Sequence, residues 1–119
     1  MTEREFKFTL RIFQNVNELS PENALLLTAT KNALKDAYAP YSNFKVAATV
    51  LLTNGETVTG TNQENAAFPA GTCAEGTALS AASALYPNVA IKKIAISVKS
   101  GTHIINHPVA PCGICRQKI

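Results

Sequence analysis

Alternating and continuous apolar residues along the chain predict β-strands at several places. Apolar and polar residues alternate over 5–13, the pattern of a half-buried strand. Residues 44–53 are apolar on both faces, which is typical of an interior strand. The hairpin dipeptide Asn54-Gly55 then leads into 57–61, which we expect to return as its antiparallel partner. A further buried strand is expected over 91–98.

Three other segments predict helices. The first begins at Ser20, whose hydroxyl can cap the helix ahead of Pro21, and continues until Pro40 stops it. The second, 73–86, is rich in alanine and serine, so it can pack very close to a neighbouring element. The third begins within 111–117, and the chain ends inside it.

This order of elements predicts an α/β fold in three layers, a mixed β-sheet with helices on both faces. The length of 119 residues suffices for one hydrophobic core, so we expect a single domain over 1–119. Residues 1–19 form an N-terminal extension that contains the first strand. Residues 62–72 have no periodicity and form a loop with several polar and aromatic side chains.

Composition and charge exclude several functional classes. The net charge is only +3, and no basic stripe interleaved with aromatic residues occurs, so binding to polymeric nucleic acid is not expected. No run approaches the roughly 18 apolar residues of a membrane span, and the N-terminus does not resemble a signal peptide. We therefore expect a cytoplasmic protein. Charged residues make up 16% of the chain, a low share that favours a homo-oligomer with surface buried between subunits.

Two acidic residues stand apart from the others. Six of the eight acids lie at or before Glu56, and only Glu64 and Glu75 follow it. Both lie in the region around Cys73, which is otherwise small and uncharged. These two carboxylates are therefore candidates for chemistry.

The three cysteines open two of the predicted helices. Cys73 begins one helix, and Cys112 and Cys115 lie in the first turn of another, within Pro-Cys-Gly-Ile-Cys. Helix N-termini favour thiolates, and a Cys-x-x-Cys pair can bind one tetrahedral ion. Three cysteine ligands leave one corner of a zinc ion open for water, as in catalytic sites. Glu75, two residues after Cys73, can face that corner and carry a proton without coordinating the metal.

Other interpretations of these residues remain. The cysteines can be small buried hydrophobes, a Cys-x-x-Cys redox pair, or ligands of a closed structural zinc with His103 or His107 as the fourth. Glu64 can brace its own loop, and Asn62 and Asn65 can be turn formers. These readings explain fewer of the residues together than a zinc centre with a neighbouring carboxylate does.

The motifs together resemble the cytidine deaminase family, in its small, three-cysteine, homotetrameric branch. Four motifs match in order and approximate spacing, from about residue 20 to the end of the chain: Ala39-Pro40-Tyr41-Ser42-Asn43-Phe44-Lys45-Val46, Asn62-Gln63-Glu64-Asn65-Ala66-Ala67-Phe68-Pro69, Cys73-Ala74-Glu75 and Pro111-Cys112-Gly113-Ile114-Cys115-Arg116-Gln117. The resemblance implies the cytidine-deaminase-like α/β/α fold and hydrolytic deamination of cytidine and deoxycytidine to uridine and deoxyuridine, in pyrimidine salvage. Zinc activates the water, and Glu75 delivers the proton.

The resemblance also implies how the nucleoside binds. Phe44 packs at the base or ribose, Asn62 and Glu64 hold a ribose hydroxyl, and backbone near Ala74 and Cys112 reads the pyrimidine. Asn65 and Phe68 complete the predicted substrate site. A buried carboxylate and amide discriminate against ligands without the sugar hydroxyl, because the protein groups would then be unpaired.

Two features depart from the family pattern. Gly76 follows Cys-Ala-Glu where arginine is usual, so we expect a weaker Lewis acid and a lower rate. The chain ends at Ile119, whereas family members continue, so we expect a missing C-terminal part and assembly as a tetramer or a dimer. The alternatives are a catalytically weak, deaminase-like nucleoside-binding module, a structural zinc domain, or a deaminase of blasticidin-like nucleosides or nucleotides.

Overall fold

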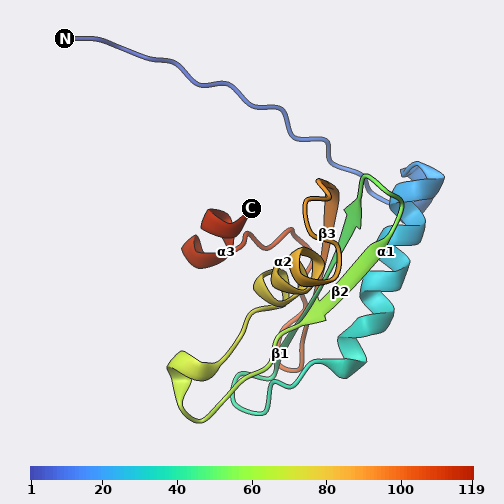
Figure 1. Ribbon diagram of the computed structural model, residues 1–119, viewed down its shortest axis with the longest axis vertical. Coiled ribbons are helices and arrows are strands. Elements are labelled where there is room, and N and C mark those ends of the chain that lie inside the picture. The colour runs from blue at the N-terminus through green and yellow to red at the C-terminus, as the bar shows by residue number, and fades with distance from the viewer.

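A three-stranded antiparallel sheet forms the centre of the computed structural model, which describes residues 1–119 (Figure 1). β1 (Phe44–Leu52) lies in the middle, with β2 (Thr57–Thr61) on one side and β3 (Ile91–Ser100) on the other. Gly55, in the turn between β1 and β2, has a φ of +87°, a conformation that glycine adopts without strain. All three strands are confirmed within two residues of their predicted ends.

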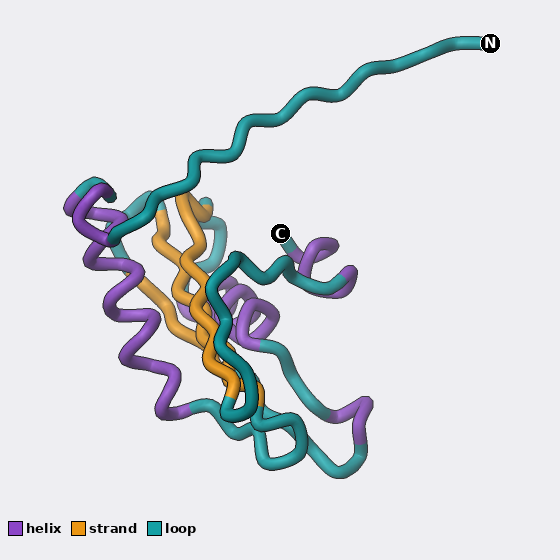
Figure 2. The backbone as a smooth tube through the Cα atoms, turned by 180° about the vertical axis from the view of Figure 1, so that it is seen from behind, coloured by secondary structure: helices purple, strands orange, loops and turns teal.

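Helices cover both faces of this sheet, as Figures 1 and 2 show from opposite sides. α1 (Pro21–Ala33) packs on β1 and β3, and α2 (Ala74–Leu85) packs on β1 and β2. The Ser20 hydroxyl caps α1 by accepting a hydrogen bond from the Asn23 backbone N–H at 3.3 Å, as predicted. The short α3 (Gly113–Lys118) contacts α2. No helix is both long and apolar enough to cross a bilayer.

The α/β class and the three layers are confirmed, with one difference in the sheet. Every strand pair is antiparallel, whereas a mixed sheet was expected. β2 and β3 run in the same direction, but β1 lies between them, so no two parallel strands are neighbours.

The N-terminal segment does not form the predicted strand. Residues 1–13 have no regular secondary structure, and the segment extends away from the fold in both views (Figures 1 and 2). Its alternating side chains are 75–85% exposed: Phe6, Phe8, Leu10 and Ile12. An alternating pattern becomes a strand only where a neighbouring strand pairs with its backbone and a core covers its apolar face, and this segment has neither.

The core between the sheet and α2 fixes the start of that helix. Inward-facing residues of β1 and β2 pack against alanines and a leucine of α2, forming one buried cluster: Ala48, Val50, Leu52, Val58, Ala74, Ala78, Leu79 and Ala82. Gly60 lies so close to α2 that a Cβ there would be 2.5 Å from Ala78 N and 2.6 Å from Ala74 O. β2 and α2 therefore meet at backbone contact, which sets the position of the residues that open α2.

Candidate active site and metal centre

Three groups that can bind a metal meet between the first turn of α2 and α3. Cys73 is the N-cap of α2, Glu75 follows in its first turn, and Cys115 belongs to α3. Their ligand atoms all lie within 4.8 Å of one another. Cys115 is fully buried, Glu75 is 7% exposed and Cys73 is half-buried, so protein covers most of the cluster. The structure thus brings together residues 42 positions apart in the sequence, as the cysteine spacing predicts.

The two sulfur atoms of this cluster are in direct contact, in the arrangement of a disulfide. The Cα atoms of Cys73 and Cys115 are 7.7 Å apart, beyond the usual disulfide range of about 4.4–6.8 Å. The Cys115 thiol also lies 4.0 Å from Glu75 Oε2, at the limit of a weak hydrogen bond. The Cα separation is thus longer than a covalent bridge usually spans.

Cys112, the remaining predicted ligand, lies outside the cluster. It is exposed and caps the N-terminus of α3 with extended backbone, at φ −70° and ψ 172°. Its carbonyl accepts the hydrogen bond from the Arg116 backbone N–H at 2.9 Å, which closes the first turn of α3. The structure places Cys112 one helical turn from Cys115 without bringing its sulfur to the other two. Its role as third ligand stays a prediction.

Neither histidine belongs to this cluster. His103 lies in the loop after β3, where its Nδ1 is 2.7 Å from the Thr102 hydroxyl oxygen. His103 and His107 are both exposed. A closed structural zinc site with a histidine as fourth ligand therefore gains no support from the structure.

The donor set at this position fits zinc. Two cysteine sulfurs and one carboxylate are ligand types that zinc accepts, and soft thiolates select against calcium and magnesium. Cys73 also lies at the N-terminus of a 12-residue helix, where unpaired backbone N–H groups favour a thiolate. The residues present are thus suitable for a zinc ion.

Backbone pairing holds the predicted substrate segment beside the cluster. Gln63 and Thr72 exchange two backbone hydrogen bonds of 2.9 Å, and Thr72 directly precedes Cys73. Tyr38 pairs with the same segment from the other side, because its N–H bonds to Asn62 O and its carbonyl accepts from Glu64 N. Residues 62–64 are therefore fixed next to the opening turn of α2.

The Glu64 carboxylate faces the loop that follows α1. Its Oε1 accepts hydrogen bonds from the backbone N–H groups of Tyr41 at 3.1 Å and Ser42 at 3.2 Å. Hydrogen bonding from Ser42, first through its side chain and then its backbone, with a further bond from Tyr41, lowers the pKa of Glu64. Both backbone bonds fall on one oxygen, and neither engages Oε2. The sequence did not predict that the Tyr41 and Ser42 N–H groups bond to Glu64. Its only indication is that both residues lie in a loop, where backbone N–H groups have no partner in a helix or strand.

Asn62 has a structural role that the sequence did not reveal. Its Oδ1 accepts from Val46 N at 2.9 Å, and its Nδ2 donates to Phe44 O at 2.8 Å. The side chain thereby continues the sheet hydrogen bonding at the start of β1. One N–H and one lone pair of the amide are left for a ligand.

The remaining predicted substrate residues differ in how far they are buried and in what they contact. Asn65 Oδ1 accepts from Ala67 N at 2.9 Å, so Asn65 forms a turn, which was one of its two expected roles. Phe68 is 90% exposed on the protruding turn Phe68–Ala70 (Figure 1), whereas Ala74 is fully buried. Phe44 is half-buried at the start of β1.

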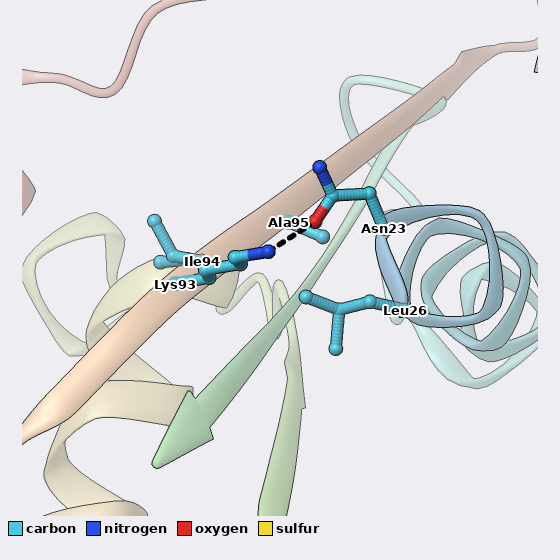
Figure 3. Close-up of a pocket in the computed structure, with 5 residues that line it drawn as sticks. All are labelled: Asn23, Leu26, Lys93, Ile94 and Ala95. Atoms are coloured by element: carbon cyan, nitrogen blue, oxygen red, sulfur yellow. Dashed lines mark hydrogen bonds between the residues drawn. The ribbon is translucent and has the colours of Figure 1, made fainter. Parts of the chain in front are cut away.

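A separate pocket lies between α1 and β3, on the opposite face of the sheet from the cysteine cluster. Figure 3 shows its lining, in which Lys93 Nζ donates a 2.6 Å hydrogen bond to Asn23 Oδ1. Lys92 and Lys93 also bond to Glu22, and these bonds lower the pKa of Glu22. The lysine is thus held in a structural ion-pair network, and the lining offers no thiol, histidine or carboxylate.

Comparison with known proteins agrees with this geometry. The family model described as the cytidine and deoxycytidylate deaminase zinc-binding region matches residues 20–119. The chain is 38% identical over 96 residues to a cytidine deaminase of Halalkalibacterium halodurans, covering 81% of this chain and 68% of that protein. It is 40% identical over 94 residues to one of Sporosarcina psychrophila, covering 79% and 65%. The chain thus spans about two thirds of the length of these relatives.

Solved structures show the same likeness. The crystal structure of cytidine deaminase from Burkholderia pseudomallei has a TM-score of 0.69 and 40% identity, covering 83% of this chain and 73% of that one. The cytidine deaminase of Mycobacterium leprae has a TM-score of 0.67 and 32% identity, with coverages of 82% and 77%. The chain therefore belongs to the cytidine and deoxycytidylate deaminase family and contains its zinc-binding region.

Proposed function

We propose that the chain catalyses zinc-dependent hydrolytic deamination of cytidine and deoxycytidine to uridine and deoxyuridine. The observation that carries this proposal is the buried cluster of Cys73, Cys115 and Glu75 at the start of α2 and in α3. The named relatives are all cytidine deaminases, which favours a pyrimidine nucleoside as substrate.

In this proposal Cys73, Cys112 and Cys115 bind the zinc ion. Cys112 precedes Cys115 by three residues, so rotation of its exposed side chain brings both sulfurs to one side of the first turn of α3. Bound zinc supplies a Lewis acid that lowers the pKa of water toward neutrality. Three protein ligands leave one position open, as hydrolysis requires.

Glu75 carries the proton. Its carboxylate is buried beside Cys115 and reaches the cluster from the first turn of α2. It takes a first proton from water and delivers it to N3 of the pyrimidine as the oxygen adds at C4. It then takes the second proton from the new C4 hydroxyl and delivers it to the amine, so that the C4–N bond breaks as the C4 carbonyl forms. Water thus provides the new oxygen at C4, and ammonia leaves. An enclosed position keeps this carboxylate away from bulk water.

The nucleoside lies between the cluster and residues 62–64. The Glu64 carboxylate accepts a hydrogen bond from a ribose hydroxyl, and its lowered pKa strengthens its preference for the charged form. The remaining Asn62 N–H donates a hydrogen bond to the same hydroxyl. Phe44 and Phe68 contact the base or ribose, Asn65 shapes the loop, and backbone at Ala74 binds the pyrimidine. A free nucleoside is favoured over a nucleotide, because a carboxylate repels phosphate.

The assembly is a homotetramer or dimer in this proposal, in the cytoplasm and in pyrimidine salvage. Small residues on the outer face of α2 support a close contact between subunits, since Ser83 and Ala84 are exposed. Sedimentation equilibrium tests this part directly. A monomer at micromolar concentration would contradict it.

The experiment for the activity compares two glutamate variants. Glu75→Gln keeps the shape of the side chain and removes its proton transfer, so we expect kcat for cytidine to fall about 10²- to 10⁴-fold with zinc retained. Glu56→Gln, at an exposed carboxylate in the hairpin, is the matched control and keeps full activity. Undiminished turnover in Glu75→Gln would overturn the proposal, as would an inactive wild type with a full zinc complement.

A further inference from the structure

A lysine of α3 comes close to the cysteine cluster from the solvent side. Lys118 follows Cys115 by three residues, so both side chains lie on the same face of the helix. The Lys118 ammonium donates a 3.0 Å hydrogen bond to Ser80 Oγ on α2. Ser80 itself lies one turn after Gly76. This bond therefore holds the ammonium over the first turn of α2.

Gly76 leaves open the space between this ammonium and the sulfur atoms. A Cβ on residue 76 would lie 3.0 Å from Cys73 Sγ, 3.8 Å from Cys115 Sγ and 3.6 Å from Lys118 Nζ. The two sulfurs and the ammonium thus all lie around the position where a side chain on residue 76 would begin. Even an alanine at position 76 would crowd Cys73.

The proposed zinc centre has a net negative charge, which a cation next to the cysteine sulfurs would partly neutralise. Zn²⁺ with three thiolates has a formal charge of −1, and two thiolates with one carboxylate give the same charge. Groups that bond to metal ligands from outside tune both metal affinity and Lewis acidity. Arg116 is unsuited to this role, because its Nε donates to Pro111 O at 3.0 Å.

We propose that Lys118 is the charge-compensating residue of the metal centre, with Ser80 as its anchor and Gly76 providing its access. The inference rests on zinc binding at the proposed site. Lys118 touches neither substrate nor reacting atoms in this account. It acts as a positioning residue that stabilises the thiolates electrostatically, from a helix other than the one that carries Glu75.

Zinc affinity tests this role without relying on activity. Competition of the purified protein with a chromophoric chelator for Zn²⁺ measures the dissociation constant. We expect Lys118→Gln to weaken zinc binding about tenfold. Lys118→Arg retains the charge and keeps most of the affinity, whereas Ser80→Ala has an intermediate effect. Lys99→Gln, at an exposed lysine of β3, is the matched control and leaves the affinity unchanged.

A structural role for Lys118 gives a different pattern. In that case Lys118→Gln would lower the melting temperature of the zinc-free protein, and Lys118→Arg would not restore zinc affinity. Equal zinc affinity in Lys118→Gln and wild type would overturn the inference while leaving the proposed function intact. Absence of zinc binding in the wild type would instead overturn the proposed metal centre. The wild-type protein thus tests the metal centre, and the Lys118→Gln variant tests the role of Lys118.

Discussion

The two helices that supply the cysteine cluster are anchored very differently. α2 has six buried residues and touches β2 at backbone distance through Gly60. α3 has six residues, of which Cys115 is the only buried one, and it follows an irregular loop over 101–112. The half of the site on α2 is thus part of the core, whereas the half on α3 is attached mainly through the cysteine cluster.

This difference shows how the site is organised. Packing against the sheet positions Cys73 and Glu75 before any metal arrives. A six-residue helix is too short to be stable by itself, so α3 depends on its contacts with α2 and on the metal. We therefore expect zinc binding to complete the site chiefly by stabilising α3.

The largest expected effect comes from disturbing the anchored half. Gly60→Ala places a methyl group against Ala78 N and Ala74 O, which forces α2 away from β2. We expect the free energy of unfolding to fall by about 2–3 kcal/mol in a urea titration. Zinc binding should weaken in the same variant, because Cys73 and Glu75 move with α2.

The matched glycine substitution in α3 is expected to give the opposite result. A Cβ on Gly113, the first residue of α3, meets no atom within 4 Å. Gly113→Ala therefore leaves stability unchanged or raises it by up to roughly 1 kcal/mol, since alanine favours helix. Equal destabilisation by the two variants would show that α2 and α3 are anchored alike.

Zinc removal has a smaller effect, confined to α3. The backbone N–H groups of Arg116 and Ile119 bond to Cys112 O and Cys115 O. After chelation we expect their hydrogen exchange to accelerate at least about tenfold, which is roughly 1.4 kcal/mol. The Thr77 N–H, bonded to Cys73 O in α2, keeps its protection. Loss of protection in both helices would contradict a preformed α2 half.

The smallest effect concerns the pH dependence of the substrate loop. Hydrogen bonds from Ser42 and Tyr41 lower the folded-state pKa of Glu64, so its stabilising contribution is present above the unfolded pKa. That contribution is lost as the pH falls through the folded pKa. We expect the melting-temperature difference between wild type and Glu64→Gln to shrink as the medium is acidified from neutral pH. A constant difference would show that the Glu64 charge does not hold the loop.

The sequence predicted most of the layered fold for identifiable reasons. Continuous apolar runs mark β1 and β3, and Asn54-Gly55 marks the turn to β2. Ser20-Pro21 marks the start of α1. Each of these signals is local, and each segment packs in the structure. The segment 5–13 carries an equally clear alternating pattern, but pattern alone does not supply a neighbouring strand.

The site was predicted to a smaller extent, because side-chain direction depends on packing. The motifs predicted a site of Cys73, Cys112, Cys115 and Glu75, and the structure brings three of these residues together but not Cys112. The bridging of β1 by Asn62 and the approach of Lys118 to Gly76 depend on contacts between distant segments. Periodicity and motif spacing contain no information about such contacts.

X-ray absorption at the zinc edge tests the central claim most directly, because it counts the sulfur ligands of the bound ion. Coordination by Cys73, Cys112 and Cys115 with one open position predicts three sulfurs at about 2.3 Å and one oxygen at about 2.0 Å. Two sulfurs and two lighter ligands, unchanged in Cys112→Ser, would contradict that account. Zinc would then be bound by Cys73, Cys115 and Glu75, the three residues that the structure brings together, and Glu75 would not be free to carry a proton.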